Sequence, residues 1–193
     1  MVRSSTNVQQ RSLRLLFGLA SSLNFKIWTQ DVTQVYLQSA GSLAREVYID
    51  KPVTELELIA DEAIQLLRPL HGLADSGNFW YREFPQHHRD MGMQTLNTDN
   101  SLWVKLTSNI LEGVSGVYVD DVIQAGTPGF DKLTDCLGER YDAKDKVNED
   151  GRIAGIELKC DEDGIRVNQS QYLKSLRPLP TDAAYEDFRS VSM

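Results

Sequence analysis

Two adjacent aspartates interrupt the apolar segment GVYVDDVIQAG, residues 116–126. Apart from Asp120 and Asp121, this segment has the pattern of a continuous strand or a tight hairpin. Side chains alternate faces along a strand and like charges held close together repel, so such a pair needs a turn, a cation or both. Two interpretations follow. The segment is either a two-residue hairpin turn that happens to be acidic, or a binding site for divalent metal ions.

Length and cysteine content limit the architecture. A chain of 193 residues with 41% hydrophobic content can bury one good core, which predicts one domain or a piece of a larger one. Cys136 and Cys160 are too few for a disulfide scaffold and too far apart for a paired metal motif. We expect them to be reduced, buried thiols.

The charge and hydropathy of the chain argue against two classes of binding partner, nucleic acids in general and membranes. The net charge is −8 and the pI is near 4.9, which argues against a general nucleic-acid binder because phosphate contacts need clustered Lys and Arg. The longest apolar run is far short of a membrane span, and the N-terminus has polar residues where a secretory signal would be uninterrupted. We therefore expect an intracellular protein with no membrane partner.

The hydrophobic period changes several times along the chain, which predicts an α+β fold. Expected helices are 12–22, a turn in 35–40, one starting at Asp75 or Ser76, one from Thr127-Pro128 to 141, and 169–176. Expected strands are 25–31, 45–49, one in the loop and strand pair of 56–70, 101–106, those in 114–126, and two around Asp163-Gly164. Pro85 should kink or end its helix near Phe84.

Most other candidate sites favour ordinary structural interpretations. His87 and His88 point in different directions on a helix and have no partner at ligand spacing, so we expect a solvated helix surface rather than a transition-metal site. The glycines form no phosphate-cradling loop. No serine or cysteine has the sequence surroundings of a catalytic nucleophile, so hydrolase chemistry is poorly supported.

A third acidic residue, Asp31, strengthens the metal-site interpretation of the Asp120-Asp121 pair. Asp31 ends one predicted apolar strand, and a sheet that pairs this strand with 114–126 would bring three carboxylates to one edge. Carboxylate and carbonyl oxygens are the ligands that Mg²⁺ prefers, and two such ions can clamp the attacking and leaving oxygens of a phosphoryl transfer. Asp31 could equally be a helix N-cap.

Several segments together resemble a known family. They are QDVTQVYLQS, REVYIDKP, LLRPLHGLADSGNFWY, DNSLWV, GVYVDDVIQAG, RIAGIELK and NQSQYLKSL. In order and approximate spacing they resemble the reverse transcriptase of copia-type retrotransposons, from about residue 4 to the end. The resemblance implies a right-hand polymerase with a palm-like antiparallel sheet, packed helices and an incomplete fingers region.

The resemblance also implies roles for individual residues. The catalytic and metal-binding residues would be Asp31, Asp120 and Asp121, with the carbonyl of Val32, and they would hold two Mg²⁺ ions, or Mn²⁺ in their place. The nucleotide-binding residues would be Val32, Tyr36, Gly72, Leu73 and Ser76, where the Tyr36 ring would exclude a ribose 2′-hydroxyl. The primer-binding residues would be Tyr118, Ala154 and Gly155. Either Lys144 or Lys146 would face the triphosphate, and the spacing does not choose between them.

The same resemblance predicts the division of the chain and its partners. Residues 1–28 would end the fingers region, 29–160 would form the palm, and 161–193 would contain the end of a palm hairpin, a short helix and a tail. The partners would be an RNA template, a DNA primer and deoxynucleoside triphosphates, in a cytoplasmic particle or the nucleus. Basic fingers strands and a ribonuclease H region would be missing, which would explain the acidic balance and predicts a fragment inactive in isolation.

Two alternatives remain open. One is a domesticated remnant that binds protein or nucleic acid without catalysis, for which an exposed basic or apolar patch would be the sign. The other is an unrelated α/β domain, metal-binding or nucleotide-handling, in which the aspartate pair is structural. A fold that keeps Asp31 away from Asp120 would favour this last interpretation.

Overall fold

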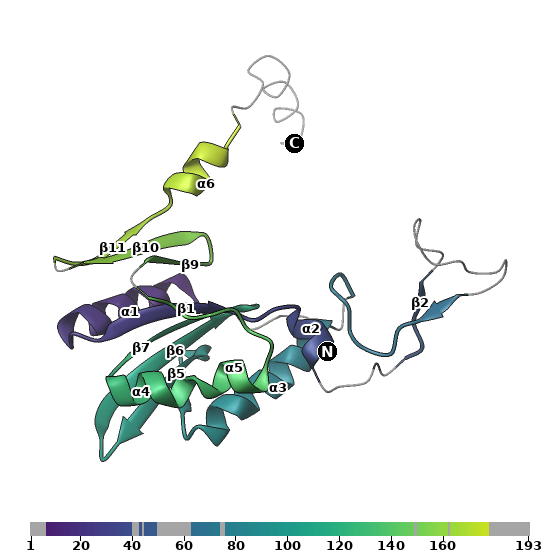
Figure 1. Ribbon diagram of the computed structural model, residues 1–193, viewed down its shortest axis with the longest axis horizontal. Helices are drawn as coiled ribbons and strands as arrows, with labels where there is room; N and C mark the ends of the chain where they lie inside the picture. The colour runs from purple at the N-terminus through teal and green to yellow at the C-terminus, as the bar shows by residue number, and fades with distance from the viewer. Residues whose placement is uncertain are drawn as a thin grey trace, which may run out of the picture.

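A six-stranded antiparallel sheet forms the centre of the molecule (Figure 1). The structure, a computed structural model, describes residues 7–39, 43, 45–49, 63–73, 76–148, 150–161 and 163–177. In spatial order the strands are β4 (Gln94–Leu96), β5 (Asp99–Thr107), β6 (Ile110–Tyr118), β7 (Asp121–Gly126), β1 (Lys26–Asp31) and β8 (Val147–Asn148). The pairing of β1 with β7 joins the two segments that carry the predicted acids.

Two smaller sheets and six helices complete the described part of the chain. The smaller sheets contain β9 (Asp150–Ile153), β10 (Ile156–Asp161) and β11 (Gly164–Asn168), and separately β2 (Tyr48–Ile49) and β3 (Ile64–Gln65). The helices are α1 (Gln10–Ser22), α2 (Val35–Gln38), α3 (Ser76–Asp90), α4 (Pro128–Thr134), α5 (Cys136–Arg140) and α6 (Ser170–Ser175). This mixture of helices and antiparallel sheets confirms the predicted α+β class. None of these described helices is long and apolar enough to cross a membrane.

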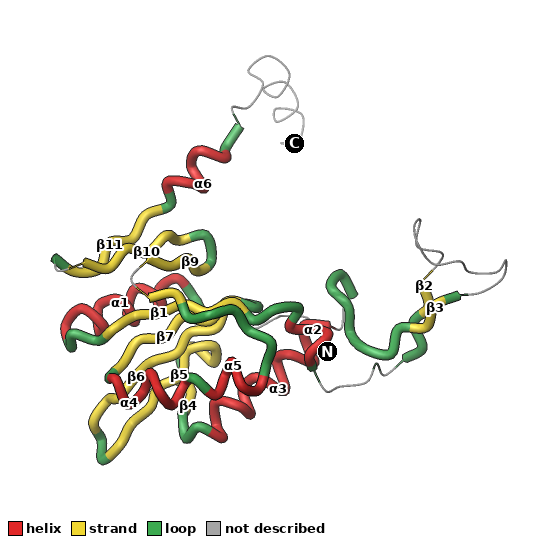
Figure 2. The backbone as a smooth tube through the Cα atoms, in the orientation of Figure 1, coloured by secondary structure: helices red, strands yellow, loops and turns green. Residues whose placement is uncertain are grey.

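One face of the central sheet packs against α1 and the three-stranded sheet (Figure 2). The predicted apolar face of the helix, including Leu13, Leu16 and Ala20, is buried there, as a 3.6-residue period requires. It contacts a core that includes Ile123 of β7. The predicted helix 12–22 is confirmed as α1, which begins slightly earlier than expected.

The other face packs against α3, α4 and α5 (Figure 2). The larger side chains of this second core are Trp28, Trp80, Phe84, Trp103, Phe130, Leu137 and Tyr141. Strand β7 serves both cores, because Val122 lies in the second and Ile123 in the first, as alternation along a strand dictates. The sheet is therefore covered by packed elements on both sides.

Helix α3 continues through Pro85 to Asp90, so it does not end near Phe84; the alternative of a kink there stays a prediction. A proline inside a helix removes one hydrogen bond and clashes with the preceding turn, at a cost of about 3 kcal/mol. Trp80, Phe84 and His88 lie on the face that packs against the sheet, and all are almost completely buried. Burial of one large apolar side chain stabilises by about 1.5–3 kcal/mol, so this face as a whole offsets the proline.

The prediction that His87 and His88 lie on a solvated surface is also wrong, because both are buried. His88 Nε2 lies 3.0 Å from Ser115 Oγ on β6, and its Nδ1 lies 3.2 Å from the Phe84 carbonyl oxygen. The His87 ring packs against the Tyr141 ring with a centroid separation of 5.6 Å. The sequence pattern failed here because aromatic partners that are distant in sequence form the environment of both imidazoles.

The helix start near Thr127-Pro128 is confirmed, since Thr127 Oγ1 accepts a hydrogen bond from the Phe130 amide. The single helix predicted to extend to residue 141 is wrong, because α4 ends at Thr134. At the break, the Asp135 amide donates to the Lys132 carbonyl oxygen. The Asp131 carbonyl oxygen accepts from Lys146 Nζ at 2.7 Å and from Thr134 Oγ1 at 2.9 Å.

The remaining predictions have mixed outcomes. The strand ending at Asp31, the hairpin around Asp163-Gly164 and the last short helix are confirmed. Cys136 and Cys160 are thiols outside any disulfide, as predicted, but they are half-buried rather than buried. Helix α3 begins at Ser76, and Asp75 lies outside the described residues. So do residues 56–62 of the predicted segment 56–70 and the tail 178–193, whereas the described part of that segment contains the short strand β3. The domain boundaries stay predictions.

Candidate active site

The two aspartates stand at a tight turn between β6 and β7. Tyr118 pairs with Asp121, so the turn consists of Val119 and Asp120 alone. Val119 has a φ of 57° while Asp120 does not share this left-handed region, which is the pattern of a type II′ turn. The acidic-turn interpretation is thus correct in geometry, and it does not exclude the metal-site interpretation.

Asp31 lies directly beside this turn. It is the cross-strand partner of Asp121 in the β1–β7 ladder, and such partners project from the same face of a sheet. The Val32 amide donates to the Asp120 carbonyl oxygen at 2.9 Å, which continues the pairing past the end of β1. The structure therefore brings Asp31 next to the Asp120-Asp121 pair, and the arrangement that would have favoured an unrelated domain is not found.

Val32 is held between the turn and the segment after α5. It forms an antiparallel bridge with Ala143, in which the Lys144 amide donates to the Asp31 carbonyl oxygen and the Thr33 amide to the Asp142 carbonyl oxygen, both at 2.8 Å. In such a bridge the N–H and C=O of the central residue point away from the partner. The Val32 carbonyl is therefore directed toward the hairpin that carries Asp120.

The electrostatics of the cluster reflect crowded negative charge. Burial, then the charge of Asp120 and then that of Asp31, raise the pKa of Asp121 to about 6. A backbone hydrogen bond from Ala154 and the positive charge of Arg152 act in the opposite direction. The three neighbouring carboxylates thus favour binding of a proton, and the same negative charge favours binding of a metal cation.

Two lysines that the sequence could not separate have different positions. Lys144 Nζ lies 3.2 Å from Asp31 Oδ2, and its side chain is 68% exposed. Lys146 Nζ is held on α4 and the turn after it by Asp131, Thr134 and Asp135, and lies 5.2 Å from the centroid of the Trp28 ring. Only Lys144 of the two adjoins the carboxylates.

A cavity of about 730 Å³ opens beside the carboxylates. Its lining includes Asp31, Tyr118, Asp121, Lys144, Arg152, Ala154 and Gly155. The last two form the turn between β9 and β10, where φ is 50° and 76°, the positive values that tight hairpins require. Asp31 and Asp121 therefore meet the predicted primer-binding residues in one cavity, although these residues lie far apart in the sequence. Asp120 is not among the lining residues of this cavity.

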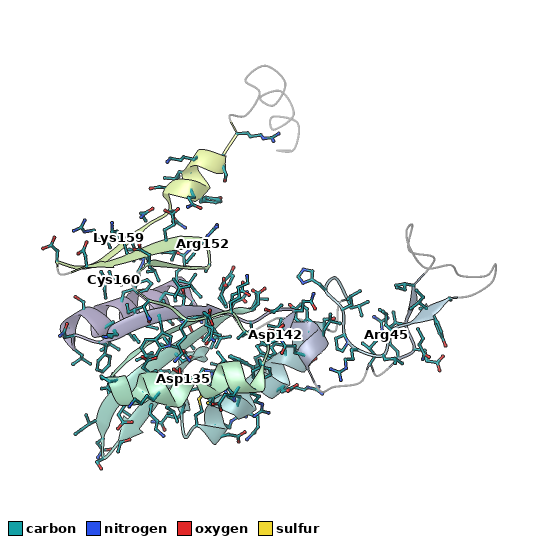
Figure 3. All side chains as sticks on the ribbon, in the orientation of Figure 1. Arg45, Asp135, Asp142, Arg152, Lys159 and Cys160 are labelled. Atoms are coloured by element: carbon teal, nitrogen blue, oxygen red, sulfur yellow. The ribbon has the colours of Figure 1, made fainter. Side chains whose placement is uncertain are left out.

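Arg152 is a lining residue that the sequence analysis missed. It lies on β9 and is labelled on the three-stranded sheet in Figure 3. Its position two residues before Ala154 in the segment RIAG was the available signal. It supplies the positive charge that opposes the rise in the pKa of Asp121.

The predicted nucleotide-binding residues Tyr36, Gly72, Leu73 and Ser76 are not among the lining residues of this cavity. Burial and the charge of Asp120 raise the pKa of Tyr36, and the Tyr36 ring lies 5.6 Å from the ring of His71. Gly72 has a φ of 96°, and a β-carbon added there would meet no atom within 4 Å. The Tyr36 ring therefore packs against the loop that contains Gly72, and its hydroxyl lies within electrostatic range of Asp120.

Ser76 and Leu73 have internal roles in that loop. The Ser76 hydroxyl donates to the Leu70 carbonyl oxygen at 2.6 Å, and Ser76 is 1% exposed. The Leu73 amide donates to the same carbonyl, and its own carbonyl accepts from the Ser76 amide. These contacts shape the loop, so contact of the Ser76 hydroxyl with a nucleotide stays a prediction.

The oxygen atoms near the turn are of the type that binds a divalent ion, but their side chains are not arranged around a common point. Three carboxylates and the Val32 carbonyl are the hard oxygen ligands that Mg²⁺ takes, and Lys144 shows that a cation is accommodated at Asp31. Within the described residues, however, no three His, Cys, Asp or Glu side chains are arranged to hold a metal ion. Side-chain rearrangement, including release of Asp31 by Lys144, would have to accompany binding.

The fold and this cluster together define an α+β protein with acids gathered at the hairpin end of an antiparallel sheet. The family model described as reverse transcriptase (RNA-dependent DNA polymerase) matches residues 3–178 of the chain. The chain therefore belongs to the reverse transcriptase family. No solved structure matches it.

Proposed function

We propose that this chain contains the palm of a copia-type reverse transcriptase, which adds deoxynucleotides to a primer 3′-hydroxyl on an RNA template. The observation that carries the proposal is the register pairing of Asp31 with Asp121 beside the turn at Asp120. Family membership supports nucleic acid as the substrate. The gathered acids give no support to the non-catalytic remnant.

The metal-holding residues would be Asp31, Asp120 and Asp121 with the Val32 carbonyl. Two bound Mg²⁺ ions would supply Lewis-acid stabilisation of the attacking and leaving oxygens and lower the pKa of the primer hydroxyl. The chain's own contribution is to fix the acids on two paired strands, so that their positions are set by backbone hydrogen bonds.

The neighbouring residues would orient the two substrates. Tyr118 and the Ala154-Gly155 turn line the cavity next to Asp121, which suits contact with the primer end. Lys144 and Arg152 bring positive charge to the same cavity, which suits phosphate oxygens. We assign Lys144, rather than Lys146, to the triphosphate, because Lys146 is engaged on α4 and the turn after it.

Tyr36 would select the sugar. Its ring packs against that of His71 in the loop that precedes α3, and the charge of Asp120 acts on its hydroxyl, which suits a place near both the acids and the predicted nucleotide-binding loop. A ring at this position would clash with a ribose 2′-hydroxyl and admit a deoxyribose.

Primer extension on a homopolymer RNA template, with Mg²⁺ or Mn²⁺, tests the proposal. We expect extension by a polypeptide that joins this chain to the polymerase segments of its family, and none by the chain alone. Extension by the chain alone would contradict the predicted dependence on further segments. Failure of both, with Mn²⁺ binding absent at Asp31 and Asp120, would refute the polymerase assignment. An intracellular location, in a cytoplasmic particle or the nucleus, is part of the same proposal.

A further inference from the structure

The turn that carries Asp120 has an unfavourable sequence for its shape. A type II′ turn normally has glycine at its first central position, because φ is positive there. Here that position is Val119, whose φ is 57° and whose side chain is branched at the β-carbon. A branched residue in this region is strained and persists only where surrounding contacts enforce it. Some contact must therefore enforce this turn.

Two hydrogen bonds hold the carbonyl groups of the turn. The Trp80 indole Nε1–H donates to the Val119 carbonyl oxygen at 2.7 Å, and the Val32 amide donates to the Asp120 carbonyl oxygen at 2.9 Å. The turn is thus fixed from α3 on one side and from the end of β1 on the other. The bond from Val32 is ordinary strand pairing, whereas the bond from Trp80 comes from a side chain.

Trp80 is itself held rigidly. It is 0% exposed, and its ring packs against Phe84 and Tyr141 with centroid separations of 4.3 and 5.2 Å. One helical turn beyond Phe84, the ring of His88 adjoins Ser115 of β6, which ties α3 to the strand that leads into the turn. An indole fixed in this way can impose a position on the carbonyl that it binds.

We propose that Trp80 is a positioning residue that enforces the strained turn and thereby places Asp120 beside Asp31. The importance of Trp80 for catalysis rests on the proposed function. Its role in holding the turn does not depend on that function. Trp80 touches no substrate in this proposal and acts only through the Val119 carbonyl. Nothing in the local sequence pattern points to it, because an apolar position on α3 reads as core.

The test compares Trp80→Phe with Trp28→Phe in the full chain. Both tryptophans are at most 1% exposed and both donate one indole hydrogen bond to the β6–β7 hairpin. Trp28, however, donates to the Gln124 side chain, away from the turn. Both variants lose similar volume and one hydrogen bond, so Trp28→Phe controls for general loss of packing.

The readout is hydrogen exchange of two backbone amides, after correction for each variant's unfolding free energy. The Val32 amide reports on the turn, and the Lys144 amide, bonded to the Asp31 carbonyl on the opposite edge of β1, is the internal reference. We expect Trp80→Phe to accelerate Val32 exchange about tenfold relative to Lys144, the effect of one lost hydrogen bond. Trp28→Phe should leave the ratio within about twofold. Equal ratios in the two variants would overturn the proposal.

A measurement on the unmodified chain covers the case in which Trp80→Phe does not fold. The Trp80 indole proton should exchange at least about tenfold more slowly than a free indole, because it is buried and bonded to a carbonyl. Exchange at the rate of a free indole would overturn the proposal by itself.

Mn²⁺ separates this inference from the proposed function. Mn²⁺ should selectively broaden the amide signals of Val32 and Asp120 in the unmodified chain and in Trp28→Phe, and Trp80→Phe should need about tenfold more ion. If Mn²⁺ broadens none of them while Trp80→Phe still accelerates Val32 exchange, the polymerase assignment fails and the positioning of the turn stands. If Mn²⁺ binds all three equally, the positioning role fails and the assignment stands.

Discussion

Asp31 and Asp121 are direct cross-strand partners, two carboxylates opposed on one face of an antiparallel sheet. Like charges in this position destabilise a sheet. Lys144 compensates Asp31 at 3.2 Å, while the pKa of Asp121 rises to about 6. The pair therefore lowers the stability of the protein, which is expected of residues kept for binding or catalysis rather than for folding.

Replacement of Asp121 should stabilise the fold in a pH-dependent way. Because its folded pKa is raised from 3.8 to about 6, the native state holds more protons than the unfolded state between these values. Stability therefore falls as pH rises through this window. After allowance for solvent screening, Asp121→Asn should gain about 1 kcal/mol at pH 7 and almost nothing at pH 4, measured by urea unfolding. Asp163→Asn, at an exposed turn, is the control, and a loss at pH 7 would contradict the prediction.

The proposed metal ligands should be essential for extension. In an active polymerase that contains this chain, Asp31→Asn or Asp120→Asn should reduce primer extension by at least about a hundredfold, because each removes charge from the metal clamp. Extension is measured on a primed RNA template. Asp163→Asn removes the same charge far from the carboxylates and should leave the rate unchanged. Near-normal extension by either ligand variant would show that it holds no metal.

Tyr36 should govern the choice of sugar. In the same polymerase, Tyr36→Ala should admit ribonucleotides, because removal of the ring opens the space that a 2′-hydroxyl would occupy. Tyr36→Phe keeps the ring and should retain discrimination. The measurement is the ratio of kcat/KM for deoxyribonucleotides and ribonucleotides. An unchanged ratio in Tyr36→Ala would assign the selection to another residue.

Replacement of Lys146 should lower the stability of the protein, whereas replacement of Lys144 should lower its activity. Lys146 is 14% exposed and bonds two carboxylates, so Lys146→Ala should cost about 2 kcal/mol of unfolding free energy. Lys144 is 68% exposed, and Lys144→Ala should change stability by less than about 0.5 kcal/mol. The same Lys144→Ala change should weaken nucleotide binding in the active polymerase. A large loss of stability in Lys144→Ala, with weaker nucleotide binding in Lys146→Ala, would assign the structural role to Lys144 and the nucleotide contact to Lys146.

The buried histidines should make the fold sensitive to acid. Burial lowers the pKa of His87 to about 4 and that of His88 to about 3, from an ordinary 6.5. Below pH 6.5 the unfolded state binds protons that the native state excludes, so stability falls as pH decreases toward 4. His87→Gln should remove about 1–2 kcal/mol of this pH dependence, measured by urea unfolding at pH 7 and pH 4.5. An unchanged slope would show that His87 is solvated.

Much of the fold could be predicted from the sequence, because the signals are local. The apolar period of Leu13, Leu16 and Ala20 predicted α1, and the Thr127-Pro128 pair predicted the start of α4. The apolar runs around Asp31 and Asp120 predicted strands that do pair. In each case one face or one cap dictates the element, and no distant residue has to be known.

Tertiary contacts decided the rest. Pro85 stays inside α3, and His87 and His88 are buried, because aromatic residues far along the chain form their environment. The sequence named both Lys144 and Lys146, and only the bonds of Lys146 to α4 and the turn after it separate them.

The acids themselves could be read from the sequence, but their arrangement could not. Residue types fix which oxygens are available, and hydrophobic periods fix which strands carry them. The register that opposes Asp31 to Asp121, and the indole of Trp80 that reaches Val119, depend on how α3 packs against the sheet. Such contacts join residues distant in the chain, whose spatial proximity is set by the packing of the whole core.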